Sequence, residues 1–266
     1  MGQRRGRRWW RLAVPVLASL AMVASATVPA SASLAPSPTP GSDISWPQCG
    51  QGYPATPAFG IVGVNNGRPD TANPCLVSEY RWALASGTVE LYMNTANPGA
   101  VAGVTSGSDA YRYGYAAARY AFTYATAHVS AGPGHLWWLD VETGNSWSSD
   151  QAANTADIAG SIAYLRSKNV MVGIYSTQYQ WGVITGGASI PSVPNWVPGA
   201  SSATQALSFC TAAQSFSGGP VLVTQYTTQF DYDRLCPGVS LPAPLAPPAN
   251  GLTQLLDALL AWLSGK

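Results

Sequence analysis

Short apolar runs alternate with longer stretches of helical spacing along the middle of the chain. The runs predict six strands, at Asp43–Trp46, Phe59–Asn65, Val89–Asn94, Leu136–Glu142, Val170–Ser176 and Val221–Tyr226. The stretches between them predict three helices, at Leu76–Ser86, Ala110–His128 and Thr155–Ser167. This alternation is typical of a parallel sheet covered by helices. If the sheet closes into a barrel, reactive groups lie at the carboxyl ends of its strands.

The strand at Leu136–Glu142 ends with two acids. Side chains alternate along a strand, so Asp140 and Glu142 share one face. Burying charge at a strand end without a purpose costs several kcal/mol. Two neighbouring carboxylates resist ionising together, and one then keeps its proton near neutral pH, which is typical of acid catalysis on a glycosidic bond. The alternative is a strand end that reaches solvent, with both acids hydrated.

The first 32 residues have the order of a secretory signal peptide. A basic head contains Arg4, Arg5, Arg7, Arg8 and Arg11. An apolar run from Leu12 to Val28 and the small residues of Ala30–Ala32 follow, which predicts export with cleavage after Ala32. The alternative is a membrane anchor, but Pro15 and the short length of the run disfavour it.

The remaining chain is poor in charge. Without the five signal arginines it has 8 basic and 12 acidic residues, a net charge of −4, and only 9% of the whole chain is charged. No basic cluster is left, which excludes a nucleic-acid partner. We expect a secreted, cell-wall-associated protein whose mature chain has no integral membrane span.

Composition divides the mature chain into four parts. Residues 33–42 are a flexible lead-in, 43–237 a single domain, and 238–251 a proline-rich linker. Leucines at helical spacing in 252–266 predict a short amphipathic helix, which is too short to span a bilayer. Such a helix fits docking onto the domain, self-association or a partner's groove; the lack of basic residues disfavours a membrane surface.

The cysteines indicate two disulfides. An even number in an oxidising compartment favours pairing, and four cysteines allow three connectivities. We favour Cys49–Cys75 with Cys210–Cys236, because each closes a loop within one end of the domain. Zinc is the alternative, but there is no Cys-x-x-Cys motif and the chain has only two histidines. No nucleotide-binding or serine-hydrolase motif is present, so we expect no cofactor and no metal.

Four motifs in a fixed order resemble the family 25 glycoside hydrolases. They are Asp43-Ile44-Ser45-Trp46-Pro47-Gln48, Asp140-Val141-Glu142, Tyr175-Ser176 with Trp181, and Gln225-Tyr226 before Asp231. The family includes secreted lysozymes that cut between the amino sugars of peptidoglycan. Each motif alone is weak, but the four together span nearly all of Asp43–Cys236. The resemblance implies an α/β fold, a single irregular TIM-type (β/α) barrel.

The resemblance also implies a set of site residues. Glu142 becomes the general acid, and Asp140 the partner that stabilises the transition state. Asp43 takes the first-strand position and Asp231 the late one, with Asp233 as its competitor. The substrate-binding residues would be Tyr175, Tyr226, Trp46, Trp181 and Asn94.

This chain departs from the family on the sugar-binding side. Val64-Asn65-Asn66 stands where a basic residue is common, Tyr92-Met93-Asn94 replaces a Tyr-His pair, and Thr224 replaces a Trp. Two functions therefore compete. The first is a retaining, muramidase-like hydrolase of cell-wall polysaccharide. The second is a barrel that binds cell-wall glycan with little or no catalysis; a glycosidase acting on another polymer is a further alternative.

Overall fold

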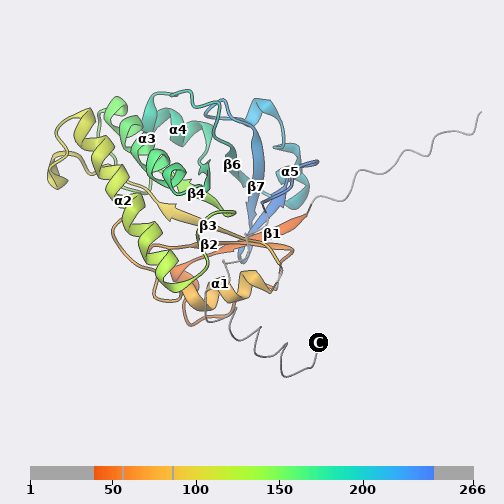
Figure 1. Ribbon diagram of the computed structural model, residues 1–266. Helices are drawn as coiled ribbons and strands as arrows, with labels where there is room; N and C mark the ends of the chain where they lie inside the picture. Colours follow the sequence, from red (N-terminus) through yellow and green to blue (C-terminus); the bar gives the residue numbers. More distant parts are fainter. Residues whose placement is uncertain (1–38, 56, 86, 243–266) are drawn as a thin grey trace, which may run out of the picture. The chain divides into compact units, whose positions relative to one another are not determined.

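The computed structural model describes residues 39–55, 57–85 and 87–242. Within these ranges eight strands close into a barrel in chain order (Figure 1). They are β1 (Pro40–Ile44), β2 (Phe59–Gly63), β3 (Val89–Asn94), β4 (Leu136–Asp140), β5 (Met171–Tyr175), β6 (Asn195–Ala200), β7 (Val221–Thr227) and β8 (Asp231–Leu235). Strands β1 to β7 run parallel, and β8 runs antiparallel to both β7 and β1. The predicted irregular α/β barrel is confirmed.

Helices follow five of the parallel strands. They are α1 (Leu76–Leu84), α2 (Gly107–His128), α3 (Gln151–Ser167), α4 (Gln178–Thr185) and α5 (Ala203–Ser208). Side-chain oxygens of Ser106 and Asp150 accept the first free backbone N–H groups of α2 and α3. With these caps, α2 begins three residues and α3 four residues before the start that the apolar spacing predicted. Short 3-10 turns stand at η1 (Trp46–Gln48), η2 (Gly99–Ala102) and η3 (Ala212–Gln214).

Several boundaries differ from those predicted. Strands β6 and β8 and helices α4 and α5 were not predicted, and β1 begins at Pro40 rather than Asp43. Residues 40–42 were expected in the flexible lead-in, but they pair with β2 and β8. The predicted signal peptide (1–32) and amphipathic helix (252–266) lie outside the described residues. Among the described helices, none is long and apolar enough to cross a bilayer.

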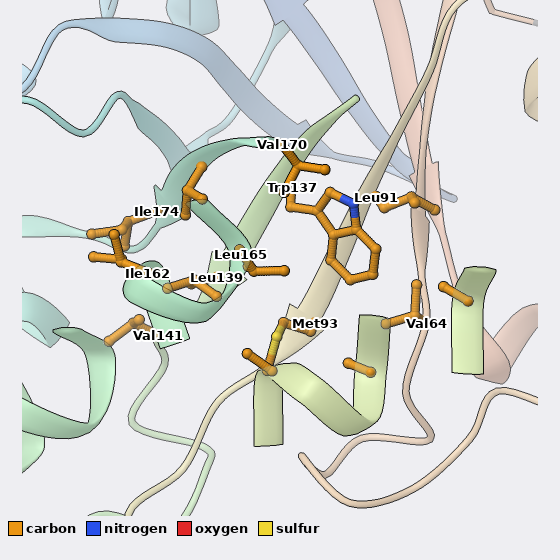
Figure 2. Packing of buried hydrophobic residues seen from close by; sticks show 14 of the residues in the cluster. Val64, Leu91, Met93, Trp137, Leu139, Val141, Ile162, Leu165, Val170 and Ile174 are labelled. Atoms are coloured by element: carbon orange, nitrogen blue, oxygen red, sulfur yellow. The ribbon is translucent and has the colours of Figure 1, made fainter. Parts of the chain in front are cut away.

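The core has two layers separated by the sheet. Inside the barrel, large side chains pack together: Phe59, Ile61, Leu136, Trp138, Trp196, Val223 and Leu235. A larger cluster fills the space between the strands and the helices. Figure 2 shows Trp137, Leu139 and Val141 in this outer cluster, packed among residues of neighbouring strands and helices. The predicted alternation along β4 is therefore confirmed.

Aromatic rings fill the middle of the barrel. The Trp138 and Trp196 rings meet edge to face at 5.6 Å, and the Tyr175 and Trp196 rings at 4.6 Å. Glycine at 173 makes room, because a Cβ there would lie 2.3 Å from the Trp138 ring. The interior below the mouth is thus occupied by side chains, and polar groups gather above it.

Helices α2 and α3 cross at two glycines. A Cβ on Gly114 would lie 1.9 Å from the Asp157 carbonyl oxygen, and one on Gly160 would lie 2.0 Å from that of Tyr111. Ser161 Oγ donates to the Gly114 carbonyl at 3.0 Å. The missing side chains let the two backbones touch.

Two disulfides join neighbouring segments of the domain. Cys49 is bonded to Cys75 and Cys210 to Cys236, each with a Cα–Cα distance of 5.5 Å and a separation of 26 residues. The predicted pairing is confirmed. The described part of the chain has no free cysteine.

Candidate active site

An open cavity of about 130 Å³ lies at the end of the barrel where the parallel strands terminate. Its walls are Asp43, Tyr92, Asp140, Glu142, Tyr175, Trp196, Gln225 and Asp231. The four acids singled out in the sequence therefore converge in one cavity.

Strand geometry explains why these acids meet. Asp140 is the last residue of β4 and lies beside Asn94 of β3 in the strand register. Asp43 is the fourth residue of β1, near its carboxyl end. Because β8 is antiparallel, its first residue, Asp231, reaches the same rim, and the register places it opposite Asp43. Each acid arrives by ordinary alternation along its strand.

Asp140 and Glu142 form a coupled pair. Asp140 is 6% exposed, and Asn94 Nδ2 donates a hydrogen bond to its Oδ2. Burial first, and then repulsion by Glu142, raise the pKa of Asp140 well above its usual range. Asp140 therefore keeps its proton to a higher pH than a free aspartic acid does.

A second hydrogen-bonded set holds Asp43. Tyr175 Oη donates to Gln225 Oε1 at 2.9 Å, and Gln225 Nε2 donates to Asp43 Oδ2 at 2.7 Å. Burial and the nearby Asp231 raise the pKa of Asp43 to about 8. On the rim, Thr227 Oγ1 donates to Asp231 Oδ1 at 2.6 Å. The cavity thus presents carboxyl groups that keep protons at neutral pH, which is typical of acid catalysis.

The late acid of the cavity wall is Asp231. Asp233 lies two residues further along β8, on the same face but deeper, and is fully buried. Trp196 Nε1 donates to its Oδ1 at 2.9 Å. Asp233 therefore has a place beside the site without facing the cavity.

Two residues predicted to bind substrate lie elsewhere. Tyr226 is absent from the cavity wall because its neighbour Gln225 takes the inward position; its ring instead stacks on Tyr232 at 5.4 Å. Trp181 is buried in α4, where its ring lies 5.5 Å from Phe216. The prediction for Trp181 was wrong, because the residue is buried, and Tyr226 lies outside the cavity wall. One followed a sequence motif without regard to strand parity, and the other placed a helical core residue in a loop.

The other predicted binding residues have mixed positions. Tyr175 lines the cavity. Asn94 lies behind the wall and acts through its hydrogen bond to Asp140. Trp46 begins η1 directly after β1 and is 42% exposed, but it is not part of the cavity wall. It stands on the rim of the barrel rather than in the site.

Sequence analysis missed three wall residues as binding groups: Tyr92, Trp196 and Gln225. Parity would have found two of them, because Tyr92 precedes Asn94 by two positions on β3, and Gln225 lies two positions after Val223 of the inner core. Trp196 belongs to β6, which was not predicted as a strand. Among the described residues, no cluster of three or more His, Cys, Asp or Glu side chains is arranged to hold a metal ion.

The barrel has the fold of the family 25 lysozymes and muramidases, as comparisons with known proteins show. The profile of a family described as "Lysozyme-like protein 1" matches residues 130–198, which contain Asp140, Glu142, Tyr175 and Trp196. A probable GH family 25 lysozyme 4 of Dictyostelium discoideum is 41% identical over 64 residues, or 22% of this chain. The match spans 30% of that relative's length.

Solved structures share the fold across most of the chain. A muramidase from Trichobolus zukalii has a TM-score of 0.53 at 19% identity, covering 86% of this chain and all of its own. A muramidase from Acremonium alcalophilum has a TM-score of 0.54 at 19% identity, covering 83% and 99%. A family GH25 lysozyme from Aspergillus fumigatus has a TM-score of 0.52 at 15% identity, covering 82% and 99%. At these identities the likeness establishes the fold.

Proposed function

We propose that this chain is a secreted glycoside hydrolase that cleaves the glycan strands of peptidoglycan in the manner of a retaining muramidase. The observation that carries the proposal is the convergence of Asp43, Asp140, Glu142 and Asp231 in one open cavity. Glycosidic cleavage needs a protonated acid beside a second carboxyl group, and the mouth of the barrel brings carboxyl groups with raised pKa values next to two further acids. The names muramidase and lysozyme of the similar proteins support this substrate.

In the proposed reaction Glu142 is the general acid. Asp140 is the deeper member of the pair, and burial favours its protonated form in the free protein. An amide N–H of the sugar's N-acetyl group that donates to Asp140 favours its ionised form, which moves the proton to Glu142. Glu142 then protonates the glycosidic oxygen while the bond from that oxygen to the anomeric carbon breaks.

The N-acetyl group supplies the first nucleophile. Its carbonyl oxygen, oriented by Asp140, attacks the anomeric carbon as the leaving sugar departs as an alcohol. Water then attacks the same carbon and displaces the N-acetyl oxygen from it, which restores the N-acetyl group. The water gives its proton to the Glu142 carboxylate, which restores the acid. Two inversions give net retention. Asp43 and Asp231 contribute polar carboxyl groups and hydrogen bonds beside the positive charge that develops on the ring.

Replacement of the general acid tests this assignment. Purified Glu142→Gln protein should release reducing ends from peptidoglycan about 10²–10⁴-fold more slowly than the wild type, because the amide has no proton to transfer. Asp109→Asn changes an exposed acid on α2 and serves as the matched control. Circular dichroism and thermal unfolding should show the same fold in all three proteins. Unchanged release by the Glu142 variant would refute the acid role.

One observation favours the second candidate, a glycan-binding barrel. Asn65 Nδ2 donates to the Pro69 and Thr71 carbonyls and its Oδ1 accepts from the Asn94 backbone, so Asn65 holds a loop and offers nothing to the cavity. Asn94 is likewise engaged with Asp140. Binding to insoluble wall without soluble fragments in mass spectrometry would support this candidate, whereas release of soluble muropeptides would exclude it.

A further inference from the structure

Asp233 is a buried acid next to the cavity that the proposed reaction does not use. Its side chain has no exposed surface, and its Oδ2 accepts no N–H or O–H from the described residues. Its Oδ1 accepts from Trp196 Nε1. Its carboxyl group lies within hydrogen-bonding reach of that of Asp43 on the neighbouring strand β1.

A hydrogen bond between two carboxyl groups contains one proton, because two carboxylates have only acceptor atoms. Asp43 lies at the open cavity and already accepts from Gln225, so its ionised form has both water and a donor beside it. Asp233 has no contact with solvent, and a charge there costs several kcal/mol. Once the pair has lost one proton, the proton that remains therefore belongs to Asp233, with Asp43 as the acceptor.

A chain of hydrogen bonds lies under the cavity, and one contact between aromatic rings joins its ends. Trp196 donates to Asp233, Asp233 to Asp43, and Gln225 to Asp43 from the other side. Tyr175 donates to Gln225 and packs against the Trp196 ring at 4.6 Å, which closes the circuit. Each member is fixed by two others.

We propose that Asp233 is a positioning residue that stays neutral and, by donating a hydrogen bond to Asp43, fixes the orientation and charge of the carboxyl group that faces the substrate. The test of this role depends on the proposed function only in the activity measurement, and not in the titration of Asp43. Burial, followed by the charge of Asp43, raises the pKa of Asp233 well above its usual range. The hydrogen bond from Asp233 lowers the pKa of Asp43, which burial and Asp231 raise. Besides Asp231, the other titratable groups of the wall are Tyr92, Tyr175, Asp140 and Glu142.

The test compares three variants by the pKa of Asp43, measured from the carboxyl ¹³C shift. Asp233→Asn keeps an acceptor for Trp196 and a donor for Asp43, so the pKa of Asp43 should stay near that of the wild type. Asp233→Leu removes the donor, so that pKa should rise. If Asp233 were ionised, both replacements would remove a negative charge and lower the pKa of Asp43, which would overturn the proposal. Asp231→Asn should lower it and serves as the positive control.

Activity gives the second measurement. Asp233→Asn should keep kcat/KM on peptidoglycan within about three-fold of the wild type, and Asp233→Leu should lose about 10- to 100-fold, mainly in kcat, since a misplaced group costs this much in well-oriented sites. Loss of activity in the Asn variant with an intact fold would show that the charge of Asp233 is needed and would contradict the proposal. An inactive wild type would refute the proposed function, while the titration would still decide the role of Asp233. If Asp233→Leu does not fold, Asp233→Asn alone decides between the two protonation states.

Discussion

Individual carboxyl groups in this barrel are held in unusual environments well beyond the mouth. Glu79 on α1, Glu90 on β3 and Asp157 on α3 are all buried, and each has one oxygen without a hydrogen-bond donor among the described residues. Burial raises the pKa of all three. A buried acid of this kind is protonated in the folded protein at a pH where it is ionised in the unfolded chain. These residues therefore make stability fall as the pH rises.

Glu79 gives this effect a defined window. Burial raises its pKa to about 7 from its ordinary value of 4.5, although Asn73 Nδ2 donates to it at 2.6 Å. The folded state binds the extra proton between pH 4.5 and 7, so stability is lost as the pH rises through that range. Glu79→Gln should therefore stabilise the protein by about 1–3 kcal/mol at pH 8 and by little at pH 4.5. Urea unfolding of the variant and the wild type at the two pH values measures this difference in stability.

An exposed acid provides the control for Glu79. Hydrogen bonds from Ser106 and Thr105 lower the pKa of Asp109 to about 2, so it is ionised at both pH values. Asp109→Asn should change stability equally at pH 4.5 and 8. Equal stabilisation by Glu79→Gln at the two pH values would contradict the assigned titration.

Strand parity decided which site residues the sequence could predict. Asp140 and Glu142 could be placed together because a single apolar strand carries both at even spacing. Tyr226 was misplaced because the Gln225-Tyr226 motif joins two neighbours on one strand, and their side chains point to opposite faces of the sheet. Gln225 points into the barrel and lines the cavity, whereas Tyr226 does not. The hydrogen bond from Asp233 to Asp43 joins strands 190 residues apart in sequence, and no local pattern contains it. Contacts of that kind depend on barrel closure.

At the scale of elements, the two strands that escaped prediction both lack an apolar run. β6 contains Pro198 and Gly199 and has an irregular register with β7. β8 reads Asp-Tyr-Asp-Arg-Leu, and its inward positions are two acids and Leu235. A strand whose inward positions are polar site residues lacks the hydrophobic pattern from which strands are predicted. The long helices α1 to α3 kept their apolar spacing and were predicted.

The crossing of α2 and α3 makes a prediction at this scale. Gly114→Ala and Gly160→Ala should each destabilise the domain by about 1–3 kcal/mol, because the added methyl meets a backbone carbonyl that cannot rotate away. The better helix propensity of alanine offsets only about 1 kcal/mol of this. Chemical denaturation measures both variants.

Helix α4 supplies the matched control. A Cβ on Gly182 meets nothing within 4 Å, so Gly182→Ala should stabilise the domain by about 0.5–1 kcal/mol. Destabilisation of similar size at all three positions would show that the close crossing is not the cause.

At the scale of the whole domain, the two disulfides allow a direct comparison. Both close loops of 26 residues, so loop entropy predicts a loss of about 3.5 kcal/mol for either one. Replacing the Cys49–Cys75 pair or the Cys210–Cys236 pair by serines should lower Tm by roughly 10 °C in scanning calorimetry. Equal losses of Tm for the two pairs would support the view that each disulfide stabilises the domain by restricting the unfolded chain. A much larger loss for one pair would locate native-state interactions at that bridge.

The reversed direction of β8 determines where the barrel's two ends lie. The chain enters β1 at Pro40 and leaves β8 after Leu235, and Leu235 N donates to the Thr39 carbonyl at 3.1 Å. Val239 and Leu241 pack against the inner core beyond this point. Entry and exit therefore share the pole remote from the acidic mouth. A tether attached at either end of the barrel would anchor it by its base and leave the mouth free to meet a large, insoluble polymer.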